Sequence, residues 1–179
     1  MIGISYCAVM TGITVLWIFV RGMVCLRQKR FSLKRELQLL LVYICVVVVT
    51  RFTFFPFGTV DGAVQPLVFE AATAFPFRLN LIPFVNLFDY ESKRDLLLNV
   101  IGNCAMFIPT GILTPVLYRH LDSFKKTLLT GFLISLAIEI IQLPFAVRAS
   151  DIDDLILNSA GYLMGYGIHL LVKALRQRR

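Results

Sequence analysis

Charged side chains and histidines are scarce in this chain. Asp, Glu, Lys and Arg make up 16% of its 179 residues, against about a quarter in soluble globular proteins, and only two histidines are present. The four cysteines lack metal-type spacing, and the sequence contains no Ser-His-Asp arrangement and no phosphate-binding glycine loop. These absences argue against a soluble enzyme, a disulfide framework and a zinc site, and we expect no cofactor.

The chain is rich in long apolar stretches. Hydrophobic residues make up 58% of the chain, and its mean hydropathy is +0.76. An α-helix that crosses a bilayer needs about 20 mostly apolar residues. The sequence therefore predicts an all-α, polytopic membrane helical bundle, with residues 1–179 forming a single membrane domain. We expect about five transmembrane helices, at about residues 3–26, 37–57, 95–118, 127–145 and 154–175.

The first apolar stretch is not followed by a small-residue cleavage pattern and has no basic region before it, so we expect a retained helix and not a cleaved signal peptide. The basic residues divide unevenly between the two sides of the predicted bundle. Twelve follow the first, third and fifth helices, and four lie on the opposite side. Because cytoplasmic loops carry the excess of Lys and Arg, we expect the N-terminus outside and the C-terminus in the cytoplasm. Attraction to anionic inner-leaflet lipid accounts for the net charge of +7 without a nucleic-acid partner.

Polar side chains recur inside the predicted helices near their outer ends. A charge within the bilayer costs about 2.5 kcal/mol or more by insertion scales, so such residues usually face the bundle interior or a water-filled cavity. Either they line an outward-facing polar cavity or they form a hydrogen-bond network between helices. Arg51 matches Glu139 in approximate depth and is its candidate partner. Three pairs share a helix face because their members are three or four residues apart: Asn99 with Asn103, Glu139 with Gln142, and Asp154 with Asn158.

An acidic segment precedes the fifth predicted helix. Asp151, Asp153 and Asp154 favour the positive end of that helix, and the spacing of Ser150 and Asp153 predicts a capping box. Arg148, just upstream, could pair with one of these carboxylates or join it in binding a phosphate-bearing or zwitterionic headgroup. The aspartates lack the spacing of a calcium loop and no His or Cys accompanies them, so we expect no metal site.

Glycines and prolines predict where the helices approach one another or bend. Gly161 and Gly165 form a G-x-x-x-G step that permits close contact with a neighbouring backbone. Pro109 and Pro115 predict a kink or a break in the third helix. The stretch NLIPF at 80–84 is expected to lie at the membrane interface or to re-enter it.

Four stretches follow one another in a recognisable order: NLIPF at 80–84, LLNVIGNCAMFIPTGIL at 97–113, SLAIEIIQ at 135–142 and RASDIDDLILNSAGYLMGY at 148–166. Together they resemble the VanZ-like family of bacterial membrane proteins, with a VanZ-like core at 80–175. The resemblance implies a small multi-pass protein of the bacterial cell membrane. The founding type of the family is associated with resistance to the lipoglycopeptide antibiotic teicoplanin. The residues that sit on the family pattern include Asn80, Pro83, Phe84, Asn99, Asn103, Pro109, Gly111, Glu139, Gln142, Asp151, Asp154, Asn158 and Gly161.

The polar residues support three classes of function. The first is a non-enzymatic protein whose outward-facing polar pocket binds a lipid-linked or acylated envelope molecule and so influences the response to glycopeptides. The second is a membrane hydrolase or transferase with Glu139 and Asp154 as general acid and base. The third is a purely structural or partner-binding role. Under the first, the expected partners are membrane lipid and a lipid-linked cell-wall precursor or lipoglycopeptide, and the candidate ligand-binding residues are Arg51, Asn80, Asn99, Asn103, Glu139, Gln142, Arg148, Asp151, Asp154 and Asn158.

Overall fold

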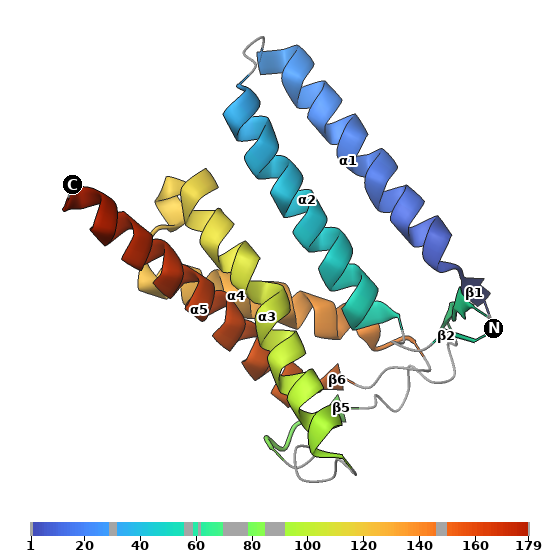
Figure 1. Ribbon diagram of the computed structural model, residues 1–179. Coiled ribbons are helices and arrows are strands. Elements are labelled where there is room, and N and C mark those ends of the chain that lie inside the picture. The colour runs from blue at the N-terminus through green and yellow to red at the C-terminus, as the bar shows by residue number, and fades with distance from the viewer. Residues whose placement is uncertain are drawn as a thin grey trace. The chain divides into compact units, whose positions relative to one another are not determined.

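The chain is mostly helical, as predicted. The computed structural model describes residues 2–28, 32–55, 59–60, 62–69, 79–84, 92–145 and 150–178. These residues include a single 3-10 turn, η3 (Arg119–Leu121), between the third and fourth helices. Each of the five helices in Figure 1 matches a predicted apolar segment to within a few residues at either end. They are α1 (Tyr6–Gln28), α2 (Leu33–Phe54), α3 (Lys93–Leu117), α4 (Phe124–Gln142) and α5 (Ile152–Gln177).

Four of these helices have the length and composition of membrane spans: α1, α2, the part of α3 from Leu96 to Leu117, and α5. The fourth predicted span, α4, is 19 residues long and contains three charged residues, Lys125, Lys126 and Glu139. Its composition alone therefore does not identify it as a span, although its surface is strongly apolar.

Short strands join segments that are far apart in the sequence, which the all-α prediction did not include. They form three two-stranded pairs: β1 (Ile2–Ile4) antiparallel to β4 (Leu67–Phe69), β2 (Thr59–Val60) antiparallel to β3 (Ala63–Val64), and β5 (Leu79–Asn80) parallel to β6 (Ser150–Asp151). Each strand has two or three residues, too few to show an alternating apolar pattern in the sequence.

The structure divides into two compact units. The first contains Met1–Phe75 with Pro144–Val147, and the second contains Pro76–Leu143 with Arg148–Arg179. In the first unit, α1 and α2 form a hairpin with polar contacts along its length. The Arg21 guanidinium pairs with the Glu36 carboxylate, and the hydroxyls of Thr14 and Tyr43 lie 2.7 Å apart. No residue of α1 is buried, so its apolar side chains are left to face lipid or another protein.

Helices α3 and α5 of the second unit pack with their backbones in close contact (Figure 1). A Cβ atom added to Gly161 would collide with the Cys104 carbonyl, and one added to Gly165 would collide with that of Ile108. The prediction from the G-x-x-x-G step is thus confirmed. Helix α3 runs without a break through Pro109 and Pro115, so the predicted break is absent, while the alternative of a kink stays a prediction. A neighbouring helix supplies packing that lets proline persist within a membrane helix.

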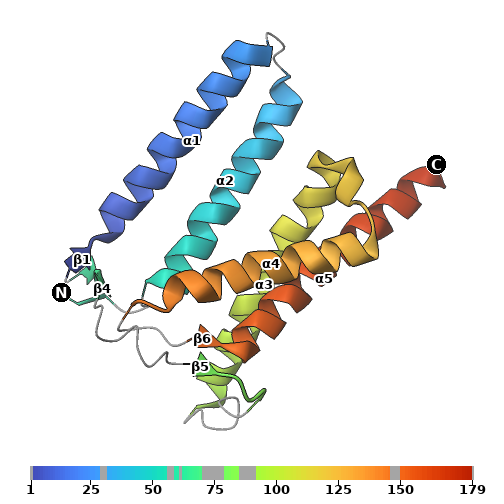
Figure 2. The same cartoon turned by 180° about the vertical axis from the view of Figure 1, so that it is seen from behind.

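Helix α4 packs against α5 and lies across it in the view from behind (Figure 2). Its outward face is apolar, with exposed residues such as Leu129, Leu133 and Ile141. Its buried residues carry no large apolar side chain: they are Thr127, Gly131, Ser135, Glu139 and Gln142. A soluble amphipathic helix has the opposite arrangement, because its apolar face turns inward. The distribution suits a helix whose exposed face meets lipid and whose polar face meets other helices.

Candidate functional site

Glu139 lies at the centre of a hydrogen-bonded cluster in the second unit, close to the carboxyl end of α4. Its Oε2 atom accepts a hydrogen bond of 2.8 Å from the Ser150 hydroxyl and one of 3.0 Å from the Asp151 backbone N–H. Both donors belong to β6, so this carboxylate fixes the segment that leads into α5. Ser150 was not among the predicted site residues, because its spacing with Asp153 indicated a helix cap.

The start of α5 departs from the predicted capping box. Asp151 is the N-cap residue, and its Oδ1 atom accepts from the Asp153 backbone N–H at 2.9 Å and from the Asn80 amide at 3.2 Å. Asp153 turns away from the cap, and its Oδ1 atom accepts from the Phe84 backbone N–H at 2.7 Å. The capping-box prediction was therefore wrong, because each of its two side chains has a tertiary partner. The aspartates do begin α5, as expected.

The Phe84 backbone has a left-handed conformation, with φ of 66°, which is unusual for a bulky residue. Its hydrogen bond to Asp153 holds it there. Leu81, Ile82 and Phe84 expose their apolar side chains beside the cluster.

Two asparagines of α3 join the cluster through Asp154. The Asn103 side-chain amide donates to the Asp154 Oδ1 atom at 2.6 Å and, more weakly, to the Asn99 carbonyl oxygen at 3.5 Å. This arrangement confirms that Asn99 and Asn103 share a face, as their spacing predicted. A hydrogen bond to a carboxylate is about twice as strong as one between neutral groups, so the link between α3 and α5 at this level rests mainly on Asn103 and Asp154.

Asn158 lies deeper in the same unit. Its amide donates to the Ser135 hydroxyl of α4 at 3.0 Å. Ser135, one turn before Glu139, was missed by the sequence analysis, although the four-residue spacing on one helix face could have identified it. Gln142 is buried near the carboxyl end of α4.

Accessibility separates these residues into a rim and a floor. The rim is part-exposed and consists of Asn80, Asn99, Asn103, Asp151 and Asp154. The floor is buried and consists of Ser135, Glu139, Gln142, Ser150, Asp153 and Asn158. The residues of the floor are covered by the rest of the structure, while those of the rim retain exposed surface.

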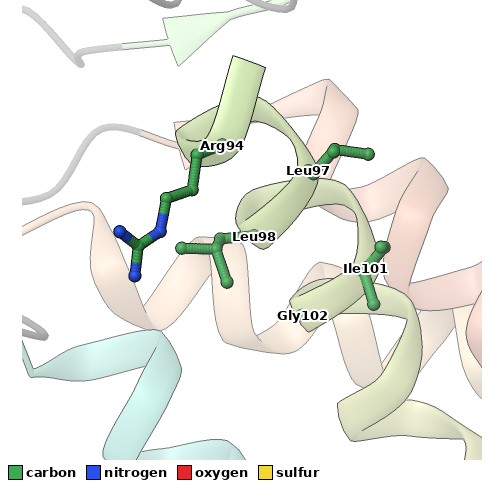
Figure 3. Close-up of a pocket in the computed structure, with 5 residues that line it drawn as sticks. All are labelled: Arg94, Leu97, Leu98, Ile101 and Gly102. Carbon is green, nitrogen blue, oxygen red and sulfur yellow. The ribbon is translucent and has the colours of Figure 1, made fainter. Parts of the chain in front are cut away.

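An open, apolar groove of about 460 Å³ lies on a different face of α3, and Figure 3 shows the residues that line it: Arg94, Leu97, Leu98, Ile101 and Gly102. Arg94 and Leu98 are one helical turn apart and point to the same side. The groove therefore combines an apolar wall with one cationic group at its end.

Two predicted site residues remain, Arg51 and Arg148. Arg51 belongs to the first unit, where its guanidinium donates to the Phe55 carbonyl at 3.2 Å and lies over the rings of Tyr6 and Phe52. Its predicted pairing with Glu139 stays a prediction. Arg148 lies outside the described residues.

A second polar cluster lies where α5 approaches the connection between α3 and α4. Asp122 accepts hydrogen bonds from the Lys173 ammonium at 2.6 Å and from the Tyr166 hydroxyl at 3.2 Å, and the His169 Nε2 atom is 3.7 Å away. The hydrogen bond from Lys173 lowers the pKa of Asp122 below its usual value, with smaller contributions from Tyr166 and His169 and against the opposing effect of partial burial. Among the described residues, no three His, Cys, Asp or Glu side chains converge in a way that could hold a metal ion.

Comparisons with known proteins agree with the resemblance seen in the sequence. The family model VanZ/LLP1 matches residues 40–173. Protein VanZ of Enterococcus faecium is 34% identical over 91 residues, which are 51% of this chain and 52% of that protein. The match thus spans about half the length of this curated relative. No solved structure matches. Since the family model covers well over half of the chain, including α3, α4, most of α5 and both polar clusters described above, the chain belongs to the VanZ/LLP1 family.

Proposed function

We propose that this chain is a non-enzymatic, multi-pass protein of a bacterial cell membrane that binds a lipid-linked or acylated envelope molecule at its outer face. Through this binding it influences the response to glycopeptides such as teicoplanin. The observation that carries the proposal is the part-exposed polar rim, which lies over a buried hydrogen-bonded floor and beside exposed apolar residues. An amphipathic ligand needs both kinds of surface.

The rim supplies groups that suit a sugar or peptide. The Asn99 and Asn103 amides and the Asp151 and Asp154 carboxylates combine donors with acceptors. Hydroxyl and amide groups of a ligand can form hydrogen bonds with the outward surfaces of these side chains. The floor supports this role because Glu139 holds Ser150 and Asp151 in place. Glu139 is thus a positioning residue in this proposal.

The apolar groove on α3 supplies the second kind of surface. Leu97, Leu98 and Ile101 are exposed along it, and Arg94 stands one turn before Leu98 near the amino end of the helix. An acyl or polyprenyl chain fits the leucine wall, and a phosphate fits the guanidinium, which binds phosphate in a bidentate manner. Leu81, Ile82 and Phe84 extend the apolar surface at the same end of the unit, where β5 pairs with β6.

The distribution of charge supports an outward-facing rim. In the second unit, basic residues gather at the end of the helices that is opposite the rim, around η3 and the carboxyl end of α5. Lys173 of α5, which contacts Asp122, lies at this end. The positive-inside rule assigns that end to the cytoplasm. α4 is the remaining span in this topology, since its exposed face is apolar and its polar residues turn toward α5.

The hydrolase or transferase alternative has less support. It requires Glu139 and Asp154 to act as acid and base on one substrate. Glu139 is buried and bonded to β6, while Asp154 is bonded to Asn103. Because the two carboxylates bond different partners, they are better suited to holding neighbouring residues in place than to transferring protons to and from one substrate.

Susceptibility measurements test the proposal. Wild-type chain, Asp154→Asn and Gly167→Ala are expressed at matched membrane levels in a glycopeptide-sensitive Gram-positive host. Gly167 has open space around its Cα, so its alanine variant is a matched control. We expect a shift selective for teicoplanin over vancomycin with the wild type and the control, and its loss with Asp154→Asn. Absence of any shift with the wild type, or a full shift with Asp154→Asn, contradicts the proposal.

A further inference from the structure

The backbone turn Asn80–Phe84, which begins in β5, ends in a strained conformation that a carboxylate holds in place. Phe84 has a φ of 66°, in the left-handed region that bulky residues rarely adopt. Its N–H donates to the Asp153 Oδ1 atom at 2.7 Å. Backbone strain of this kind persists where surrounding contacts impose it, and it is concentrated in switch regions and ligand clamps. The hydrogen bond to Asp153 therefore opposes the release of this strain.

The Asp153 carboxylate is buried but incompletely hydrogen-bonded. Only 5% of the residue is exposed, and its Oδ2 atom has no hydrogen-bond partner in the described part of the chain. Buried polar atoms in native proteins are nearly always paired, because an unpaired one loses its hydration without compensation. The contact between Phe84 and Asp153 thus combines two unfavourable features, a strained backbone and an unpaired carboxylate oxygen.

The turn contacts the floor of the polar cluster at two points. β5 pairs in parallel with β6, which places Leu79 opposite Ser150 (Figure 1). Five residues later, the Phe84 N–H bonds Asp153. Ser150 and Asp153 both belong to the buried floor. A backbone change at Phe84 would release the second contact and uncover Asp153, while β5 would keep the turn attached to β6.

The outer surface of the turn is apolar. Leu81, Ile82 and Phe84 all have exposed side chains. The acyl chain of an amphipathic ligand can therefore contact the turn while the polar part of the ligand lies at the rim. A contact that is more favourable with the open turn than with the closed one shifts the population toward the open conformation.

We propose that the turn Asn80–Phe84 is a gate, and that Asp153 is the ligand-binding group behind it. When Phe84 changes from the left-handed to an extended conformation, its N–H leaves Asp153 and the backbone strain is released. The Asp153 carboxylate then accepts a hydrogen bond from a hydroxyl or ammonium group of the ligand, which replaces the lost donor. This inference rests on the binding function proposed above and adds how the site is opened.

Hydrogen–deuterium exchange of the full chain in lipid nanodiscs measures the opening of the gate without any ligand. The exchange rate of the backbone amide at position 84 reports how often its bond to Asp153 breaks. Phe84→Gly and Phe84→Ala both remove the ring, but glycine adopts a positive φ without strain. Leu81 has no positive φ, so Leu81→Gly and Leu81→Ala form the matched control pair.

We expect the amide at position 84 to exchange by local opening, faster than the amides of α5 beside Gly161. After correction for intrinsic rates, exchange at position 84 should be about fivefold slower in Phe84→Gly than in Phe84→Ala. Leu81→Gly should be no slower than Leu81→Ala. Asp153→Asn keeps an acceptor oxygen but loses the charge, so exchange at position 84 should be about fivefold faster than in the wild type.

Association of teicoplanin with immobilised nanodiscs, with empty nanodiscs as the reference, then tests whether opening limits binding. A ligand that binds only the open conformation associates more slowly when that conformation is rarer, so Phe84→Gly should associate more slowly than Phe84→Ala. No association with the wild type contradicts the binding function and, with it, the gate. Equal association rates for the two Phe84 variants, equal exchange at position 84 in these variants, or exchange there as slow as beside Gly161 would overturn the gate alone.

Discussion

Replacement of Glu139 should lower the free energy of unfolding of the second unit, and the hydrogen bonds of its carboxylate set the size of the loss. The carboxylate accepts bonds from Ser150 and from the Asp151 backbone, and Ser150 is itself buried. Glu139→Ala leaves both donors without an acceptor, at about 1–3 kcal/mol each, so we expect a loss of about 2–6 kcal/mol in the free energy of unfolding. Glu139→Gln keeps an oxygen acceptor but removes the charge that strengthens both bonds, and we expect a loss of about 1–2 kcal/mol.

Unfolding of the purified protein by SDS in mixed micelles, followed by helical circular dichroism, measures these differences. Ser150→Ala removes only one donor and should cost about 1 kcal/mol. The double variant Glu139→Ala/Ser150→Ala should be less destabilised than the sum of the two single variants, with a coupling of about 0.5–3 kcal/mol. An alanine variant of Glu139 that unfolds like the wild type, or strict additivity with Ser150→Ala, would refute the reasoning that this carboxylate anchors β6.

Two further predictions concern helix packing and pH. Gly161→Ala forces a Cβ against the Cys104 carbonyl and should lower the free energy of unfolding by about 1–3 kcal/mol. Gly167→Ala, which has open space, should change this free energy by no more than about 0.5 kcal/mol. Equal effects of the two variants would contradict the packing argument. Because the pKa of Asp122 is lowered in the folded protein, its contacts contribute stability above the unfolded pKa of about 3.9, and this contribution is lost as pH falls through the folded value. Proteolysis of the α3–α4 connection should therefore accelerate on acidification below about pH 4, and a rate that is independent of pH there would count against the ion pair.

Most of the helical architecture could be predicted from apolar length. The five segments could be found because a helix that crosses a bilayer needs about 20 mostly apolar residues, and four of them have the length and composition of such a span. The contact of Gly161 with α3 and the shared face of Asn99 and Asn103 were also predictable, since both follow from helical periodicity.

The partners of the polar residues were harder to predict. Ser150 and Asp153 fit a local capping pattern, but the first bonds Glu139 and the second bonds the Phe84 backbone. Tertiary contacts outweighed the local rule because β5 and β6 bring distant segments together through strands of only two residues. A sequence can show which residues lie on one face of a helix, but the choice among several nearby acceptors depends on distances of a few tenths of an ångström.

The apolar outer face and polar inner face of α4 bear on how this helix enters the membrane. In the topology proposed above, α4 spans the membrane, and a nascent α4 that entered alone would expose the face containing Ser135, Glu139 and Gln142 to hydrocarbon, where an acidic residue opposes insertion. Glu139 and Ser135 of that face are hydrogen-bonded to Ser150 of β6 and to Asn158, and both partners follow α4 in the chain. On that topology, we expect stable integration of α4 to wait for synthesis of α5, so that the two helices enter the membrane as a pair. A ribosome stalled between them would hold an unfinished helix that is open to quality-control proteases, so truncation in this part of the gene should remove the protein from the membrane altogether.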